Sequence, residues 1–177
     1  MNRDDVMRET LKHVRRVGNL MLDVVERMQR RAMSHDDSKF SEVEFPSFAE
    51  ETPKLREMTY GSDEYKEALK RLGPALESHY YHNRHHPEYW AMDDIGSRVY
   101  EDQVKSGQAI ESMNLIDLIE MLADWKAATE RHEDGDLRKS IEHNAQRFGY
   151  SDHTKHLLLS TAEYLGWFDA GRPQGND

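Results

Sequence analysis

A chain of 177 residues is long enough for one domain with a single core. Apolar residues make up 37% of it and charged residues 33%, a balance typical of a helical protein with a wide solvated surface. The formal net charge of -10 excludes duplex nucleic acid as the expected partner, because phosphate backbones bind basic surfaces. A small phosphorylated substrate remains compatible with this charge.

The absence of cysteine excludes disulfides and thiolate chemistry, so any metal would have to be bound by His, Asp or Glu. No apolar run approaches the length of a membrane span, and the first residues lack signal-peptide character. We therefore expect a cytoplasmic protein without a membrane partner.

Residues 3–33 are predicted to form one long helix, because apolar side chains recur in it at helical spacing. A second set of apolar residues widens the pattern to another face, so we expect this helix to lie centrally with neighbours on both sides. The first set is Met7, Leu11, Val14, Gly18, Met21, Val25 and Met28, and the second is Val6, Val17, Leu20 and Val24.

The middle of the chain is interrupted by prolines and by the turn at residues 61–63, and no apolar alternation of period two appears there. Short helices are therefore expected rather than strands. Ser62 is a typical helix cap, and a helix over residues 75–86 should break before Pro87. The polar, poorly periodic residues 92–112 are predicted to form a mobile lid or loop.

From Asn114 to residue 132 the sequence again predicts a helix, which ends or is interrupted at Gly135. Another helix is expected over residues 137–148, and a last one, capped by Ser151 or Asp152, should reach residue 167. Residues 171–177 are predicted to be a disordered tail. The chain as a whole is predicted to be all-α, with one helical domain over residues 1–170.

Histidines and carboxylates occur at spacings that suit metal binding. Glu9 and His13 lie four residues apart on one helical face, His35 and Asp36 are adjacent, and four histidines fall within residues 79–86. Each motif alone is weak, since such residues are more often solvated surface or ordinary core.

The predicted helix after Asn114 carries a stronger signal. Asp117, Glu120 and Asp124 follow one another at i, i+3 and i+7 within a helix that is apolar nearly all round. Some of these carboxylates must therefore be buried, and a buried carboxylate needs a polar partner or a metal.

Taken in order, these motifs resemble those of the HD metal-dependent phosphohydrolase superfamily. The segment HDDSK is similar to the HDxGK segment of HD-GYP-type proteins, NRHHPE to their HHE motif, and LADWKAATERHED to the segment that supplies the last aspartate. HDxSK, NRHHPE and EMLxDWKAA also resemble a family found in phages and bacteria. The GYP signature is absent, Ser38 replaces a glycine, and Lys39 replaces the acid of deoxynucleotidase relatives. These departures leave the substrate open.

The resemblance implies a helical bundle of the HD type and one or two divalent transition-metal ions, namely Mn, Fe, Co, Ni or Zn. It places the first ion on His13, His35, Asp36 and Asp124, with Asp117 as the alternative to Asp124. A second ion would use Glu9, His85 and His86, and either His79 or His82. Asp37, Glu120 or Asp117 would orient the ligand histidines.

The implied activity is hydrolysis of a nucleotide or a related phosphate ester through a metal-activated water. Lys39 and Arg84 are expected to bind the phosphate, His82 or His79 to protonate the leaving oxygen, and Tyr81 and Trp90 to stack on a base or sugar. The alternatives are a non-catalytic metal- or nucleotide-binding protein on the same scaffold and a di-iron, oxygenase-like enzyme. An oligomer is compatible with the sequence.

Overall fold

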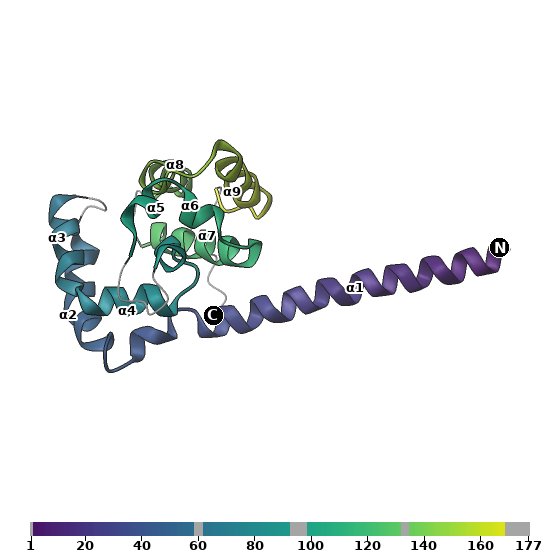
Figure 1. The fold of residues 1–177 in the computed structure, drawn as a ribbon, viewed down its shortest axis with the longest axis horizontal. Helices are drawn as coiled ribbons and strands as arrows, with labels where there is room; N and C mark the ends of the chain where they lie inside the picture. Colours follow the sequence, from purple (N-terminus) through teal and green to yellow (C-terminus); the bar gives the residue numbers. More distant parts are fainter. Residues whose placement is uncertain (1, 59–61, 93–98, 132–134, 169–177) are drawn as a thin grey trace. The chain divides into compact units, whose positions relative to one another are not determined.

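The computed structural model describes residues 2–58, 62–92, 99–131 and 135–168 (Figure 1). In this part of the chain the only extended pairing is an isolated bridge between Met92 and Val99, so the all-α prediction is confirmed. The helices are α1 (Arg3–Ser34), η1 (Asp37–Phe40), α2 (Phe45–Glu57), α3 (Asp63–Leu72), α4 (Pro74–His82), η2 (Pro87–Ala91), α5 (Glu101–Lys105), α6 (Gln108–Glu111), α7 (Leu115–Thr129), α8 (Leu137–Phe148) and α9 (Asp152–Tyr164).

The chain divides into two compact units, residues 1–35 and residues 36–177. The first unit consists of α1, whose start is fixed by a capping box between Asn2 and Asp5. This confirms the long helix predicted over residues 3–33. A single helix cannot form a domain with a core of its own. The division into two units therefore neither supports nor contradicts the single domain predicted over residues 1–170. The central position predicted for this helix also stays a prediction.

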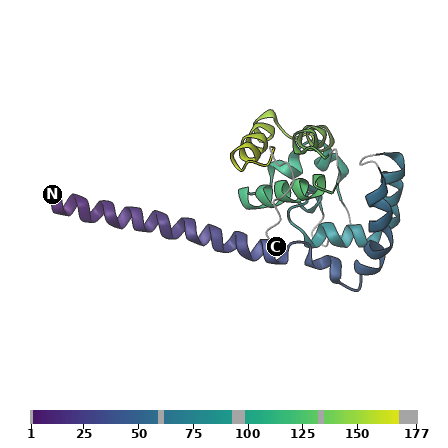
Figure 2. The ribbon, with the colours of Figure 1, turned by 180° about the vertical axis from the view of Figure 1, so that it is seen from behind.

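The core of the second unit is formed by its C-terminal helices. α7 contacts both α8 and α9, and the three helices lie together in Figure 2. The rings of Trp125 and Phe148 stack with centroids 6.2 Å apart, which joins α7 to α8. Large apolar side chains that α6, α7 and α8 bury fully in this core are Ile110, Met121, Leu122 and Ile141.

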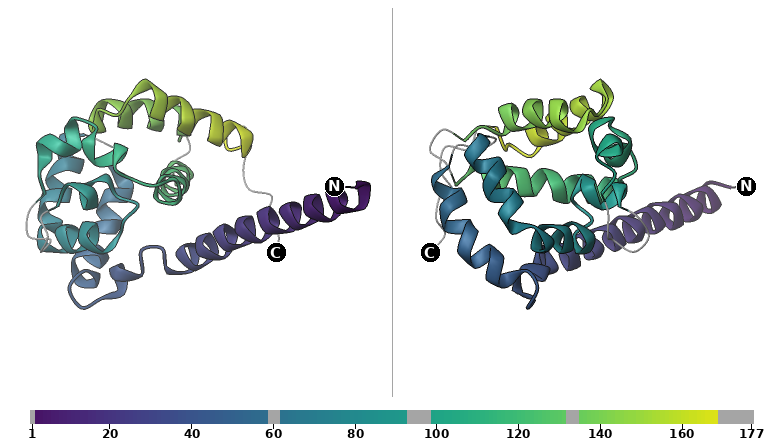
Figure 3. Two further views of the ribbon diagram at one scale, coloured as in Figure 1. Left: turned by 45° about the vertical axis from the view of Figure 1, so that its right-hand side comes forward. Right: turned by 60° about the vertical axis from the view of Figure 1, so that its left-hand side comes forward.

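A second group of helices carries much of the candidate site. α2 and α3 pack side by side, as Figure 3 shows, and α4 contacts both α2 and η1. Ala68, Leu72 and Ala75 are buried in this layer. Ser62 accepts a hydrogen bond from the backbone of Tyr65 at 3.1 Å, which confirms it as the predicted helix cap.

α4 ends at His82, four residues before the predicted end of the helix over residues 75–86. Asn83 adopts an extended conformation, and its side-chain amide donates to the carbonyl of His79 at 2.7 Å. The amide thus satisfies a carbonyl at the helix end and stops the helix there. His85 and His86 consequently lie in the turn before η2 rather than on a helix.

The lid or loop predicted over residues 92–112 is wrong for its second half. α5 and α6 occupy residues 101–111, and Val104, Ala109 and Ile110 are buried in the core. Two helices of five and four residues are too short to produce a helical period, and most of their residues are polar, so the sequence showed no helix there. Residues 93–98 lie outside the described residues.

The last three helices agree closely with their predictions. Asn114 caps α7, α8 has the predicted bounds, and the Ser151 hydroxyl accepts from the backbone of Thr154, so Ser151 is the cap of α9. α9 ends at Tyr164, before the predicted residue 167. The tail predicted over residues 171–177 lies outside the described residues. Among the described helices, none is both long and apolar enough to cross a membrane.

Gly149 allows α8 to end against α5. It has φ 62°, and a Cβ there would overlap the carbonyl oxygen of Lys105. We expect Gly149→Ala to lower the free energy of unfolding by about 2–4 kcal/mol, through left-handed strain and this overlap. Gly166→Ala is the matched control, because Gly166 has φ 69° with no atom within 4 Å of a Cβ. Urea unfolding of both variants checks the difference, and equal losses would refute the overlap.

Candidate metal centre

Asp36 occupies an unusual backbone position at the start of the second unit. Its φ of 59° makes it the non-glycine residue with positive φ among those described, at the cap of η1. Aspartate tolerates this left-handed conformation better than most residues, although it still costs energy. Lys39 binds one carboxylate oxygen, Nζ to Oδ2 2.6 Å, which leaves Oδ1 directed at two histidines.

The first histidine is His79 on α4, which is only 3% exposed. Its Nδ1 lies 3.0 Å from Oε2 of Glu44, and its Nε2 lies 3.4 Å from Oδ1 of Asp36. The Asn83 side-chain amide also lies 3.0 Å from Nδ1. Because a carboxylate only accepts, Glu44 favours the tautomer with the proton on Nδ1, which turns the Nε2 lone pair toward Asp36. This is the arrangement by which proteins orient a metal-binding imidazole.

Glu44 is completely buried at the end of the turn before α2. Besides His79 Nδ1, it accepts hydrogen bonds from the hydroxyls of Ser38 and Ser78, both at 2.9 Å. Three hydrogen-bond donors thus satisfy the oxygens of this buried side chain, which offsets the cost of removing them from water. Glu44 therefore fixes the orientation of His79 from behind.

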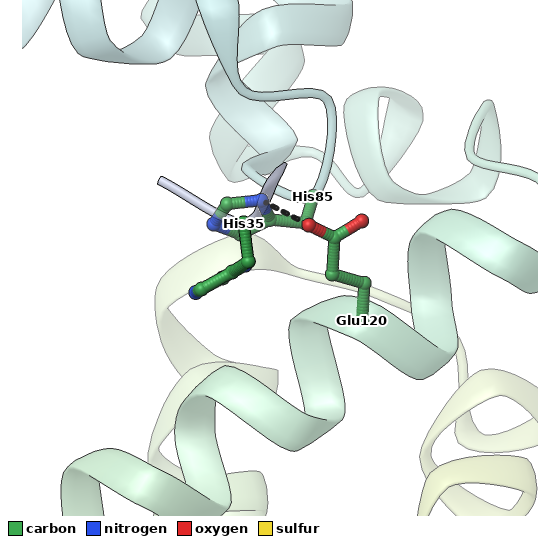
Figure 4. A group of neighbouring side chains, drawn as sticks. All are labelled: His35, His85 and Glu120. Carbon is green, nitrogen blue, oxygen red and sulfur yellow. Dashed lines mark ion pairs between the residues drawn. The ribbon is translucent and has the colours of Figure 1, made fainter. Parts of the chain in front are cut away.

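The second histidine, His85, repeats this arrangement with a different carboxylate. Its Nδ1 lies 3.2 Å from Oε1 of Glu120 on α7, as Figure 4 shows, and its Nε2 lies 3.4 Å from Asp36 Oδ1. The two imidazoles, each backed by a carboxylate, therefore face the same oxygen of Asp36. Glu120 is one of the three residues that the sequence suggested for orienting a ligand histidine, and that role stays a prediction.

His86 completes the group, with its Nε2 3.0 Å from Nε2 of His79. Ligand atoms of Asp36, His79 and His86 all lie within 4.8 Å of one another. Burial holds the pKa of His86 well below its usual value, and the neighbouring His85 and His79 lower it further. Burial also lowers the pKa of His79, against the opposing effect of Asp36. Both rings are thus neutral near pH 7, the state that binds a metal.

Asp124 has the better position of the two candidates for the last aspartate. An oxygen of Asp124 lies within 4.8 Å of an Asp36 oxygen. Asp117 instead closes the capping box of α7 with Asn114 and lies 3.3 Å from Nη2 of Arg84. The geometry therefore favours Asp124, and Asp117 has a different set of partners.

The ligands predicted in the first unit stay predictions. Glu9 and His13 lie on exposed turns of α1, where Glu9 pairs with Lys12 at 2.8 Å. His35 is the last residue of that unit and is joined directly to Asp36. The group described here consists of residues of the second unit alone.

The residues predicted to bind substrate are placed around the centre in different ways. The Lys39 ammonium is paired with Asp36, and Arg84 lies over the Trp90 ring at 4.4 Å while pairing with Asp117. His82 is exposed, with Nδ1 2.8 Å from the carbonyl oxygen of Ser78. Tyr81 is 42% exposed and contacts the His82 ring edge-on.

Sequence reasoning missed Glu44 and gave His79 only optional roles, at a second ion or in protonating the leaving oxygen. Glu44 carries no local signal, because SEVEF resembles any exposed acidic turn. His79 could have been given more weight, since it is one of four histidines within residues 79–86.

The depressed pKa of His86 predicts how the metal-free protein responds to acid. Above the ordinary value of 6.5 the ring is neutral in both folded and unfolded states and contributes nothing. Below that pH the unfolded chain binds the proton first, so stability falls, by up to about 1.4 kcal/mol per pH unit. Urea midpoints in chelator from about pH 7.5 to about pH 5.5 check this. His86→Gln should flatten the slope, and an equal slope would contradict the assignment.

The second unit is thus a helical bundle with a buried histidine–carboxylate centre. The chain belongs to the family described as "Family of unknown function (DUF5662)", whose model matches residues 2–166. The searches of curated proteins and of solved structures found no match.

Proposed function

We propose that this protein is a metal-dependent phosphohydrolase of the HD type, acting on a nucleotide or a related phosphate ester. The observation that carries the proposal is the pair of carboxylate-backed histidines, His79 and His85, whose Nε2 atoms face one oxygen of Asp36. Two or more imidazoles with carboxylates suit a divalent transition metal better than Mg.

The residues of this group fit a divalent ion. Asp36, His79 and His86 offer three ligand atoms within reach of one ion, and His85 and Asp124 lie beside them. A bound ion would supply hydroxide near neutral pH and offset charge that develops on the phosphoryl group. Glu44 and Glu120 keep the ligand nitrogens of His79 and His85 unprotonated and correctly aimed.

We assign Lys39 to the phosphate and His82 to the leaving oxygen. The Lys39 ammonium pairs with Asp36 Oδ2 and lies over the Phe48 ring, and it would also donate to a phosphate oxygen. His82 has Nδ1 2.8 Å from the Ser78 carbonyl oxygen and would donate from Nε2 to the leaving oxygen. Arg84, whose guanidinium lies over the Trp90 ring, would attract the anionic substrate electrostatically.

One observation favours a second candidate, a metal-binding protein without turnover. Both cations assigned to the phosphate already have carboxylate partners in the chain, Lys39 with Asp36 and Arg84 with Asp117. A metal held by the same ligands would then stabilise the fold rather than activate water.

The test is phosphate release from a panel of nucleotides by protein stripped of metal and reloaded with Mn, Fe, Co, Ni, Zn or Mg. We expect release with at least one transition metal, lost in His79→Ala and retained in His156→Ala, a substitution of an exposed histidine on α9. Metal binding without release would favour the second candidate. Oxygen consumption by the iron form would favour an oxygenase, and absence of any metal binding would refute the centre.

A further inference from the structure

The first unit raises a question that the metal centre does not answer. α1 is 32 residues long, about 48 Å, and nothing within the first unit buries any of its residues. A single helix has no core, so its apolar side chains leave water only when they pack against another element. Ten large apolar residues of α1 have exposed fractions between 40% and 66%: Val6, Met7, Leu11, Val14, Val17, Leu20, Met21, Leu22, Val24 and Val25.

The spacing of these residues specifies the kind of element that covers them. One stripe alternates steps of four and three residues over three heptads: Met7, Leu11, Val14, Gly18, Met21, Val25 and Met28. A strict period of 3.5 is the repeat by which helices supercoil around helices of the same repeat. The stripe therefore favours another helix with heptad spacing as its partner.

Gly18 indicates the direction of the partner. A Cβ at this position would meet no atom within 4 Å, so the stripe has a gap at its middle. In a parallel pair Gly18 would face Gly18 of the second copy and leave the gap unfilled. In an antiparallel pair it faces Met21 of the second copy, which fills it.

The positions beside the stripe also suit an antiparallel pair. In that register Arg15 faces Leu22 of the second copy, and Val17 faces Val24 of the second copy. A parallel pair would instead place Arg3 beside Arg8 of the second copy, a repulsive contact.

From this spacing and the gap at Gly18, we propose that α1 pairs with α1 of a second copy as an antiparallel coiled coil. The competing occupant is the second unit. Residues 3–34 carry eight basic and five acidic side chains, +3, so the rest of the chain carries -10 minus 3, or -13. That opposite charge would attract α1, and the experiment separates the two outcomes.

The chain has no cysteine, so single introduced cysteines report the pairing cleanly. In the antiparallel register Val14 faces Val25 of the second copy. We expect mildly oxidised Val14→Cys and Val25→Cys, mixed as full-length chains, to form a heterodimeric disulfide, and each alone to form little. Val14 and its own counterpart would be about 16 Å apart, too far for a disulfide. Cross-linking of each variant alone would overturn the antiparallel arrangement.

Solution mass provides the second test. We expect the unmodified chain to approach twice its 20.8 kDa with rising concentration, and Met21→Glu to remain a monomer. Asn19→Glu is the matched control, because it adds the same charge to α1 outside the stripe and should leave the dimer intact. Circular dichroism shows whether Met21→Glu remains folded. A monomer at every concentration, without cross-links in the mixture, would overturn the proposal.

Discussion

Asp36→Asn should abolish metal binding at the centre and lower metal-dependent phosphate release by at least about 100-fold. Asparagine has the same shape and also tolerates the left-handed backbone of this residue, so the turn into η1 is kept. The substitution removes the charge that faces Nε2 of His79 and of His85. Metal content after dialysis and phosphate release under saturating metal measure the two effects.

Asp37→Asn is the matched control for this variant. Asp37, which the sequence suggested as one possible orienting residue, is the next residue in the chain but is exposed, so the same chemical change is made away from the buried histidines. We expect its metal content and turnover to equal those of the unmodified protein. If Asp36→Asn retained one ion per chain and full turnover, the centre described here would not be the site of the chemistry.

Glu44→Gln should weaken metal binding by about 10- to 100-fold while leaving the ligand atoms unchanged. The glutamine amide donates where the carboxylate accepted, so it favours a bond from its Nε2 to Nδ1 of His79. The ring proton then moves to Nε2, the nitrogen that faces Asp36. Titration calorimetry measures the affinity, and nitrogen NMR of the histidines reports the change of tautomer.

A loss of stability alone would produce a different pattern, so Glu44→Gln needs two controls. Glu42→Gln changes an exposed residue of the same turn and should alter neither affinity nor melting temperature. Unfolding of the metal-free Glu44→Gln protein shows how much stability the lost carboxylate removes. Unchanged metal affinity together with an unchanged His79 tautomer would show that Glu44 has no orienting role.

The helices that could be predicted are those with a complete local signal. α7 has an asparagine cap and a long apolar run, and α8 and α9 have caps and helical periodicity. α5 and α6 could not be predicted, because their formation depends on burying Val104 and Ile110 against helices that follow later in the chain. A helix of one turn has no stability without such contacts.

The candidate site divides in the same way. Asp36, His85, His86 and Asp124 were chosen from motifs, and the fold brings them into one region of the second unit. Glu44 could not be found, because its role depends on donors at Ser38 and Ser78, six and 34 residues away, that come together only on folding. Local sequence indicates ligand atoms better than it indicates the groups that hold them.

α7 presents three carboxylates on one face, and each has a separate task. Asp117 closes the helix start and contacts Arg84, Glu120 backs His85, and Asp124 lies beside Asp36. Because each residue turns the helix by about 100°, one inserted or deleted residue between Asp117 and Glu120 would misdirect part of this set whichever end stayed fixed. Members of the family should therefore differ here by substitution, and their changes of length should fall in the segments before Asn114 or after Thr129.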